Sequence, residues 1–136
     1  MTPNIALILG SFHKKRVERM LKKARRVAKE LGLHIAQEVW VPGSMEKPLA
    51  LKRVLASPHI AGAVVLGIIE RGETKHGLVM AQSVIPLILQ LQLDFMKPVG
   101  VGILGPEILD KQIDERLEAY AEKAVRAVKE MLELLE

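Results

Sequence analysis

The chain has 136 residues, of which 49% are hydrophobic, 26% charged and only 3% aromatic, and it contains no cysteine. The missing cysteines exclude disulfide frameworks, thiolate zinc sites, iron–sulfur clusters and cysteine nucleophiles, and the four histidines lie too far apart for a typical metal-ligand spacing. The net charge of +4 suits an anionic ligand or a nucleic acid, but 20 basic and 16 acidic residues are also typical of an ordinary solvated surface.

The length and the N-terminal residues limit the class of protein. A chain of this size buries roughly 68% of the surface it exposes when unfolded, so we expect a single domain over residues 1–136. No apolar run approaches the roughly 20 residues of a membrane helix, and the N-terminus has no charged segment before an apolar one. We therefore expect a soluble, unprocessed, cytoplasmic protein without a membrane partner. Its many charges and aliphatic residues also favour a thermophilic source.

Four short apolar runs alternate along the chain with four longer amphipathic ones. The short runs are hydrophobic almost throughout, as strands covered on both faces are, and span residues 4–9, 34–41, 61–69 and 99–104. The longer runs have apolar residues at helical spacing and span residues 14–31, 46–56, 75–93 and 109–135. This (βα)4 order predicts an α/β fold, a flavodoxin-like three-layer α/β/α sandwich with a four-stranded parallel sheet.

Glycine and proline residues mark the expected boundaries of these elements. Gly32 follows the first helix and Pro58 the second, while Gly105 and Pro106 stand where the fourth helix can begin. Pro86 predicts a kink in the third helix because it removes one backbone donor.

Ligands of an open parallel sheet bind beyond the carboxyl ends of the strands, so the strand-to-helix loops are the expected site. These loops span residues 10–13, 42–46, 70–76 and 105–107. Phe12 stands in the first loop, either as a core plug at the end of the sheet or as a platform on which a planar ring stacks. Ser44 and Glu46, at the start of the second helix, are either residues that cap the helix and complement its dipole or ligand contacts.

The third loop combines several groups that suit an anionic substrate. Gly72 allows a tight turn, Thr74 can cap the helix, and the free N–H groups of the helix start form an anion site beside Arg71 and Lys75. His76, in the first turn of that helix, can exchange protons near neutral pH with whatever the loop binds. A histidine at a helix start is also often purely structural, so both interpretations stay open.

Two other sequence patterns are weaker evidence for a ligand than these loops are. Residues 100–105 fit G-x-G-x-x-G, but the first two glycines fall inside the fourth apolar run and too little chain follows for a dinucleotide site. The first helix is rich in Lys and Arg, yet these interleave with apolar residues as on a solvated amphipathic face, and aromatic stacking residues are missing. We expect neither a dinucleotide nor a nucleic acid as partner.

Two segments at these loops resemble a known family. VPGSMEKPLALKRVL at residues 41–55 and LGIIERGETKHGLV at residues 66–79 are similar to the V-P-G-[SA]-aromatic-E-x-P-x-A and G-x-x-I-x-G-x-T-x-H segments of 6,7-dimethyl-8-ribityllumazine synthases, in the same order. LGPEILDKQIDER at residues 104–116 is similar to the archaeal branch of that family. The resemblance covers nearly the whole chain, and the two motifs are specific together rather than singly.

The resemblance implies a condensation in riboflavin biosynthesis that requires no cofactor and no metal. The amine of 5-amino-6-(D-ribitylamino)uracil attacks the carbonyl of 3,4-dihydroxy-2-butanone 4-phosphate, phosphate leaves, and ring closure gives 6,7-dimethyl-8-ribityllumazine. The resemblance also implies a transferase that works as a homopentamer with its sites between subunits, and some family members assemble twelve pentamers into a capsid.

The resemblance further implies roles for individual residues. Phe12 would stack on the pyrimidine and His76 would transfer protons, while a neighbouring subunit would supply Val101 as a pocket wall and Arg116 as the phosphate ligand. The other implied substrate contacts are Ser44, Met45 and Glu46 with the pyrimidine and ribityl chain, Ile68, Ile69 and Glu70 along the ring, and Glu73 and Thr74 beside the four-carbon phosphate.

Several positions depart from the family pattern, and each replacement weakens ring packing or adds charge. The replacements are Met45 for an aromatic residue, His13 for asparagine, Glu70 for isoleucine and Val101 for an apolar residue that is often phenylalanine. The lysine expected shortly after Arg116 aligns with Glu122, and Lys123 stands one position away. These departures leave open a non-catalytic flavin- or pterin-binding or assembly homologue, and the shared fold leaves open the archaeal type of riboflavin synthase.

Overall fold

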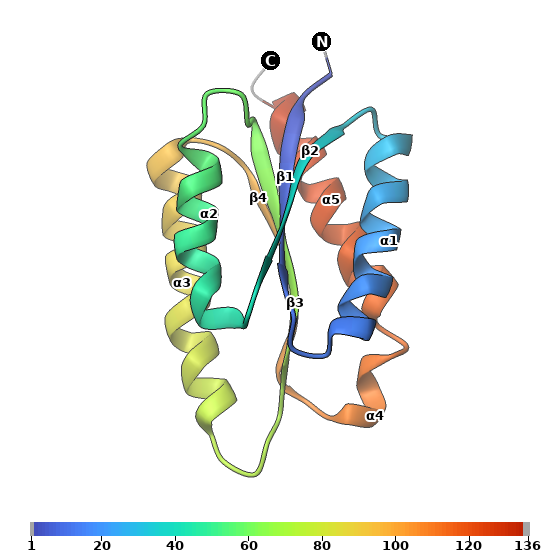
Figure 1. Cartoon of the computed structure of the whole chain (residues 1–136), viewed down its shortest axis with the longest axis vertical. Helices are drawn as coiled ribbons and strands as arrows, with labels where there is room; N and C mark the ends of the chain where they lie inside the picture. Colours follow the sequence, from blue (N-terminus) through green and yellow to red (C-terminus); the bar gives the residue numbers. More distant parts are fainter. Residues whose placement is uncertain (1, 135–136) are drawn as a thin grey trace.

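The computed structural model describes residues 2–134 as a sheet between two layers of helices. The strands β1 (Asn4–Gly10), β2 (His34–Val41), β3 (Gly62–Glu70) and β4 (Val99–Ile108) are parallel and lie in the order β2-β1-β3-β4. One face is covered by α1 (Lys14–Glu30) and α5 (Leu117–Leu134), and the other by α2 (Lys47–Leu55) and α3 (His76–Phe95) (Figure 1). A 3-10 turn, η1 (Ser44–Glu46), precedes α2, and the short α4 (Asp110–Ile113) precedes α5. The predicted three-layer sandwich is confirmed.

Both central strands are buried on their two faces, which explains their nearly continuous hydrophobicity. Successive strand residues point to opposite sides of a sheet. In β1, Leu7 and Leu9 therefore join the core beneath α1 and α5, whereas Ala6 and Ile8 join the core beneath α2 and α3. Because β1 and β3 are neighbouring parallel strands, the loops that follow them emerge side by side at the carboxyl end of the sheet.

The glycines of the G-x-G-x-x-G pattern lie within β4 and serve helix packing. A Cβ atom at Gly100 would overlap the carbonyl oxygen of Ala124, and one at Gly102 would lie 2.7 Å from the Leu66 side chain. Since neither glycine has a side chain, α5 packs directly on the backbone of β4. The pattern has a structural cause in this chain.

The prediction for residues 105–116 is wrong in two respects. β4 does not end at residue 104 but continues through Gly105 and Pro106 to Ile108, where the Ile108 carbonyl accepts a 2.8 Å hydrogen bond from the Arg71 N–H. Gly105 makes this path possible with a φ of +99°, next to the Ile69 carbonyl oxygen, where a Cβ atom would overlap it. The helix expected over 109–135 is divided, since α4 ends at Ile113 and α5 begins at Leu117; residue 135 lies outside the described residues.

The expectation that no segment is long and apolar enough for a membrane helix is wrong for α3. It has 20 residues and a mean hydropathy of 1.5, so by length and composition alone it is a candidate membrane span. Glutamine and serine residues interrupt its apolar run in the sequence without adding charge. In the fold, α3 packs against α2 and β4 with one side. Its other side leaves Val79, Leu87, Leu89 and Leu93 exposed.

Candidate active site

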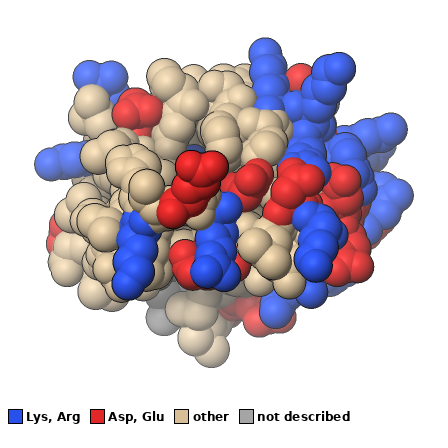
Figure 2. All heavy atoms as spheres, turned by 90° about the horizontal axis from the view of Figure 1, so that it is seen from below, with Lys and Arg blue, Asp and Glu red and all other residues tan. Residues whose placement is uncertain are grey.

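The carboxyl ends of β1, β2 and β3 and the start of α3 enclose a cleft of about 420 Å³. It lies at the lower end of the molecule in Figure 1, where the loops after these strands meet. Figure 2 views this end from below: charged side chains gather most densely on the side of α1 and α4, and fewer of them lie on the side of α2 and α3. The cleft is therefore at the edge of the sheet where parallel α/β folds bind ligands.

Nine of the predicted site residues, contributed by three separate loops, line this cleft. They are Phe12, Ser44, Met45, Glu46, Ile68, Ile69, Glu70, Thr74 and His76. Glu73, Val101 and Arg116 do not line it in the single chain. Met80, one turn after His76 on α3, also lines the cleft. Its spacing of four residues from His76, which places the two on one face of a helix, was the available signal for this residue in the sequence.

The environment of Phe12 decides between its two interpretations. The side chain is 53% exposed and faces the cleft, so it is not a core plug. Its ring contacts the imidazole of His13, with the ring centroids 4.3 Å apart. The Ser11 hydroxyl donates a 3.2 Å hydrogen bond to the Val41 carbonyl and so ties this loop to the end of β2. Phe12 thus offers a ring face to a ligand.

Two of the residues that depart from the family pattern bond to each other. His13 Nε2 and Glu70 Oε1 are 2.6 Å apart, and both side chains are about one quarter exposed. His13 holds a left-handed backbone conformation immediately before α1, which directs its ring toward the end of β3. The pair links the ends of β1 and β3 and gives the Glu70 carboxylate a partner at the wall of the cleft.

The start of α3 places His76 at the cleft. Thr74 Oγ1 accepts a 3.3 Å hydrogen bond from the His76 N–H. The N-cap position of α3 is occupied by Lys75 and not by Thr74, so the predicted capping role of Thr74 is wrong, although its hydroxyl does bond to the helix start. A Cβ atom at Gly77 would lie 3.1 Å from the Glu70 carbonyl oxygen, so glycine allows the helix to begin close to β3. The His76 side chain is exposed and has no hydrogen-bond partner within residues 2–134. Its imidazole is free to contact a ligand.

Neither Ser44 nor Glu46 makes a capping hydrogen bond through its side chain, so that part of the prediction is wrong. Glu46 does stand at the position before α2, where a carboxylate complements the helix dipole. Ser44 is instead buried, and its Oγ accepts a 3.2 Å hydrogen bond from Nζ of Lys47. Lys47 is 1% exposed, and this burial lowers the pKa of its ammonium to about 8. Sequence reasoning missed Lys47, although its spacing of four residues from the buried Leu51 was an available signal for the inner face of α2.

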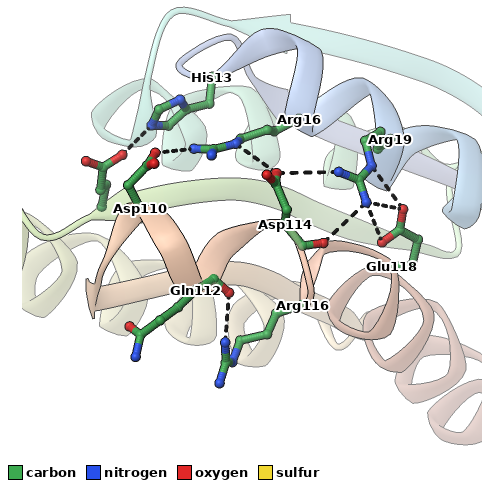
Figure 3. A network of polar contacts seen from close by, with 9 residues as sticks. His13, Arg16, Arg19, Asp110, Gln112, Asp114, Arg116 and Glu118 are labelled. Carbon is green, nitrogen blue, oxygen red and sulfur yellow. Dashed lines mark hydrogen bonds and ion pairs between the residues drawn. The ribbon is translucent and has the colours of Figure 1, made fainter.

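Arg116 lies in the turn between α4 and α5, away from the cleft of its own chain. Its guanidinium donates a 2.8 Å hydrogen bond to the Gln112 carbonyl. Figure 3 shows Arg116 directed away from the ion pairs that join α1 to this segment, in which Arg16 lies 2.8 Å from Asp110 and 3.0 Å from Asp114. The hydrogen bond with Arg16 also lowers the pKa of the Asp110 carboxyl. These ion pairs fix the turn that presents Arg116 to the surroundings.

Val101 and Glu122 both make contacts within their own chain. Val101 is half-buried on β4 and packs on the core beneath α2 and α3. Glu122, at the position where a phosphate-binding lysine is expected, pairs with Arg126 at 2.8 Å and Lys23 at 3.3 Å. The hydrogen bonds of Arg126 and then Lys23 lower the pKa of the Glu122 carboxyl. Within residues 2–134 no cluster of three His, Asp or Glu residues forms a metal-binding group.

Comparison with known proteins gives consistent matches over nearly the whole chain. The family model described as 6,7-dimethyl-8-ribityllumazine synthase matches residues 2–136. The 6,7-dimethyl-8-ribityllumazine synthase of Metallosphaera sedula is 37% identical over 127 residues, which cover 93% of this chain and 84% of that protein. The protein of the same name from Methanococcus maripaludis is 33% identical over 132 residues, covering 97% and 96%. That of Staphylothermus marinus is 37% identical over 128 residues, covering 94% and 85%.

Proposed function

Because the chain belongs to the 6,7-dimethyl-8-ribityllumazine synthase family, we propose that the cleft at the ends of β1, β2 and β3 is its active site. The chain is a transferase of riboflavin biosynthesis. It condenses 5-amino-6-(D-ribitylamino)uracil with 3,4-dihydroxy-2-butanone 4-phosphate to 6,7-dimethyl-8-ribityllumazine, phosphate and water. The comparisons do not favour the non-catalytic homologue or the archaeal type of riboflavin synthase.

The observation that carries this assignment of the site is the convergence of three loops on one cleft. An aromatic ring, two carboxylates and an imidazole, from Phe12, Glu46, Glu70 and His76, line the same space. The pyrimidine would stack on Phe12, since a half-exposed ring offers its face to a planar ligand. Backbone groups of Ile68 and Ile69 would then lie along the edge of the ring, with Ser44, Met45 and Glu46 in contact with the pyrimidine and the ribityl chain.

The chemistry needs proton transfers that His76 is placed to perform. When the substrate amine attacks the carbonyl carbon, a C–N bond forms and the carbonyl oxygen leaves as water, which requires a proton to be delivered to that oxygen. Departure of phosphate requires a proton to be removed from the carbon chain. After phosphate has left, the ribitylamino nitrogen attacks the remaining carbonyl carbon, and the oxygen of that carbonyl leaves as a second water when the ring closes. A free imidazole at the mouth of the cleft can give and take these protons, and such catalysis contributes roughly 10²–10⁴-fold. Holding both substrates in one cleft supplies much of the remaining acceleration.

The phosphate end of the site is incomplete in one chain. Glu73 and Thr74 stand in the loop beside His76, but Arg116 and Val101 lie elsewhere. We infer that a neighbouring copy brings its Arg116 and Val101 to the cleft. The exposed apolar side of α3, with Leu87, Leu89 and Leu93, is the surface that a second copy would cover.

We accordingly propose a homopentamer, with or without further assembly into a shell. Light scattering at micromolar concentration should report a particle of five subunits or a multiple of five. A monomer under these conditions would contradict the shared site. We also propose that the chain forms a single domain, that it works in the cytoplasm, and that its source is thermophilic; its match over residues 2–136 to a biosynthetic family supports the first two proposals.

The direct test of the activity is to mix the purified protein with both substrates and follow the absorbance and fluorescence of the lumazine. The reaction without protein sets the background, because the amine and the ketone also condense slowly unaided. A rate well above background is expected. A protein that binds the pyrimidine but does not exceed the background rate would instead be a non-catalytic homologue.

A further inference from the structure

Lys47 is the one charged side chain that is buried within residues 2–134, and Ser44 is the only other buried polar residue there. Lys47 begins α2 and lies on its inner face with Leu51 and Leu55, where packing alone favours an apolar side chain. A buried ammonium destabilises a fold unless its donors are bonded, and an apolar replacement is often neutral or stabilising. Packing therefore does not explain this lysine.

Two glycines form the space that the ammonium occupies. Gly10 ends β1 and Gly67 lies near the end of β3, and these two strands are neighbours at the centre of the sheet. A Cβ atom at Gly67 would overlap Nζ of Lys47, and one at Gly10 would lie 3.3 Å from it. The ammonium thus lies between the ends of the two central strands and is bonded to Ser44, which lines the cleft.

The hydrogen bond to Ser44 fixes the direction of the Ser44 hydroxyl. An ammonium can only donate, so in the 3.2 Å contact Nζ donates and Ser44 Oγ accepts. The hydroxyl hydrogen of Ser44 is then available for another acceptor, and within residues 2–134 Ser44 Oγ donates to none. Because Ser44 lines the cleft, a ligand acceptor bound there is a candidate partner for this hydrogen.

We propose that Lys47 is a positioning residue of the condensation site, whose ammonium holds the Ser44 hydroxyl as a hydrogen-bond donor to an acceptor atom of the pyrimidine substrate. This inference depends on the proposed function, because it takes the pyrimidine as the ligand beside Ser44. Without the ammonium, the hydroxyl can rotate and present a lone pair, which repels a carbonyl oxygen of the uracil ring.

The same geometry makes affinity for the pyrimidine depend on pH. When Lys47 loses its proton, the neutral amine can accept a hydrogen bond from Ser44, and the hydroxyl turns away from the cleft. Four other titratable groups face this end of the sheet from neighbouring elements: Glu46 on η1, His13 after β1, Glu70 on β3 and His76 on α3. None of them is hydrogen-bonded to Lys47 within residues 2–134, and burial is the cause that lowers its pKa to about 8.

The test compares Lys47→Met, Ser44→Ala and the double variant in binding 6-(D-ribitylamino)uracil, which lacks the attacking amine. Calorimetry at pH 7 should show about five- to tenfold weaker binding for each single variant, the effect of losing one hydrogen bond to the ligand. The double variant should be no weaker than the weaker single variant, because both remove the same interaction. KM for the four-carbon phosphate should not change.

Lys97→Met is the matched control. Lys97 is half-buried, and its Nζ donates to the carbonyls of Leu55 and Ser57, at the opposite end of the sheet from the cleft. Its removal should leave affinity for the analogue within about twofold of that of the unaltered protein, because it does not touch Ser44. A Lys47→Met protein that also stays within twofold, or single effects that add fully in the double variant, would overturn the positioning role.

A second measurement needs no Lys47 variant. Affinity of the unaltered protein for the analogue should fall as pH rises through about 8, and Ser44→Ala should remove this dependence. Equal pH dependence in both proteins would overturn the inference. A protein that binds the analogue in this way but forms no lumazine would refute the proposed function and leave the link between Lys47 and Ser44 standing, so the two failures are distinguishable.

Discussion

Replacing Lys47 by methionine keeps the length of the side chain and removes its buried charge. Burial lowers the pKa of this ammonium from 10.5 to about 8, since it loses its hydration and gains only the Ser44 hydroxyl as a partner. At about 1.4 kcal/mol per pH unit, the charged form reduces the free energy of unfolding by about 3 kcal/mol.

The sign of the pH dependence follows from which state holds the proton. Below pH 8 both the folded and the unfolded chain are protonated at Lys47, and the full cost is present. Between pH 8 and 10.5 the folded chain has lost this proton while the unfolded chain keeps it, so stability from this group rises with pH. Lys47→Met should therefore be more stable than the unaltered protein at pH 7 by up to about 3 kcal/mol. Its advantage should shrink by roughly 2 to 3 kcal/mol at pH 10.

Unfolding in guanidinium chloride at pH 7 and pH 10, at one fixed protein concentration, measures this difference, because stability of an oligomer depends on concentration. Lys52→Met on the exposed side of the same helix is the control. Its difference from the unaltered protein should change by less than about 0.5 kcal/mol between the two pH values. A Lys47→Met advantage that is equal at both pH values would refute the buried-charge argument.

Three substitutions test the cleft itself. Phe12→Ala should weaken binding of the ribityl-pyrimidine analogue by about 0.5–1.5 kcal/mol and hardly change stability, whereas a stability loss of about 3–5 kcal/mol would mark a core residue. His76→Ala should lower kcat by about tenfold or more with little change in binding, and unchanged steady-state rates would contradict its role in proton transfer. Arg116→Ala should raise KM for the four-carbon phosphate by about tenfold and weaken competition by inorganic phosphate; unaltered competition would exclude it as the phosphate ligand.

The central strands were predictable because their burial is recorded directly in composition, as in β3, where only the last residue is not buried. The expectation that residues 34–41 are also covered on both faces is wrong, because β2 is an edge strand in which only Val41 is buried. The end of β4 was not predictable, because Gly-Pro usually interrupts a strand, and only the close approach of Gly105 to Ile69 keeps the chain beside β3. The break before α5 was not predictable either, because no glycine or proline stands there. It occurs where Asp114 pairs with Arg16 of α1, a contact across 98 positions of sequence.

The location of the candidate site and the residues within its motifs were predictable from the sequence. The three loops come to one cleft because parallel strands deliver them to the same edge of the sheet. The pairing of His13 with Glu70 could not be read from the sequence, since the two residues are 57 positions apart and each is ordinary by itself. Lys47 was missed because a lysine beside Glu46 suggests solvent, and only the glycines of two other strands give it room inside.

The central claim, a lumazine-forming site shared between subunits, can be tested by mixing two impaired proteins. His76→Ala and Arg116→Ala subunits are dissociated, combined in equal amounts and reassembled, and the rate of lumazine formation is measured. If His76 of one subunit works with Arg116 of the next, about one site in four contains both intact residues, and activity should recover to about a quarter of that of the unaltered protein. A mixture that is no more active than the average of its two components would contradict the shared site.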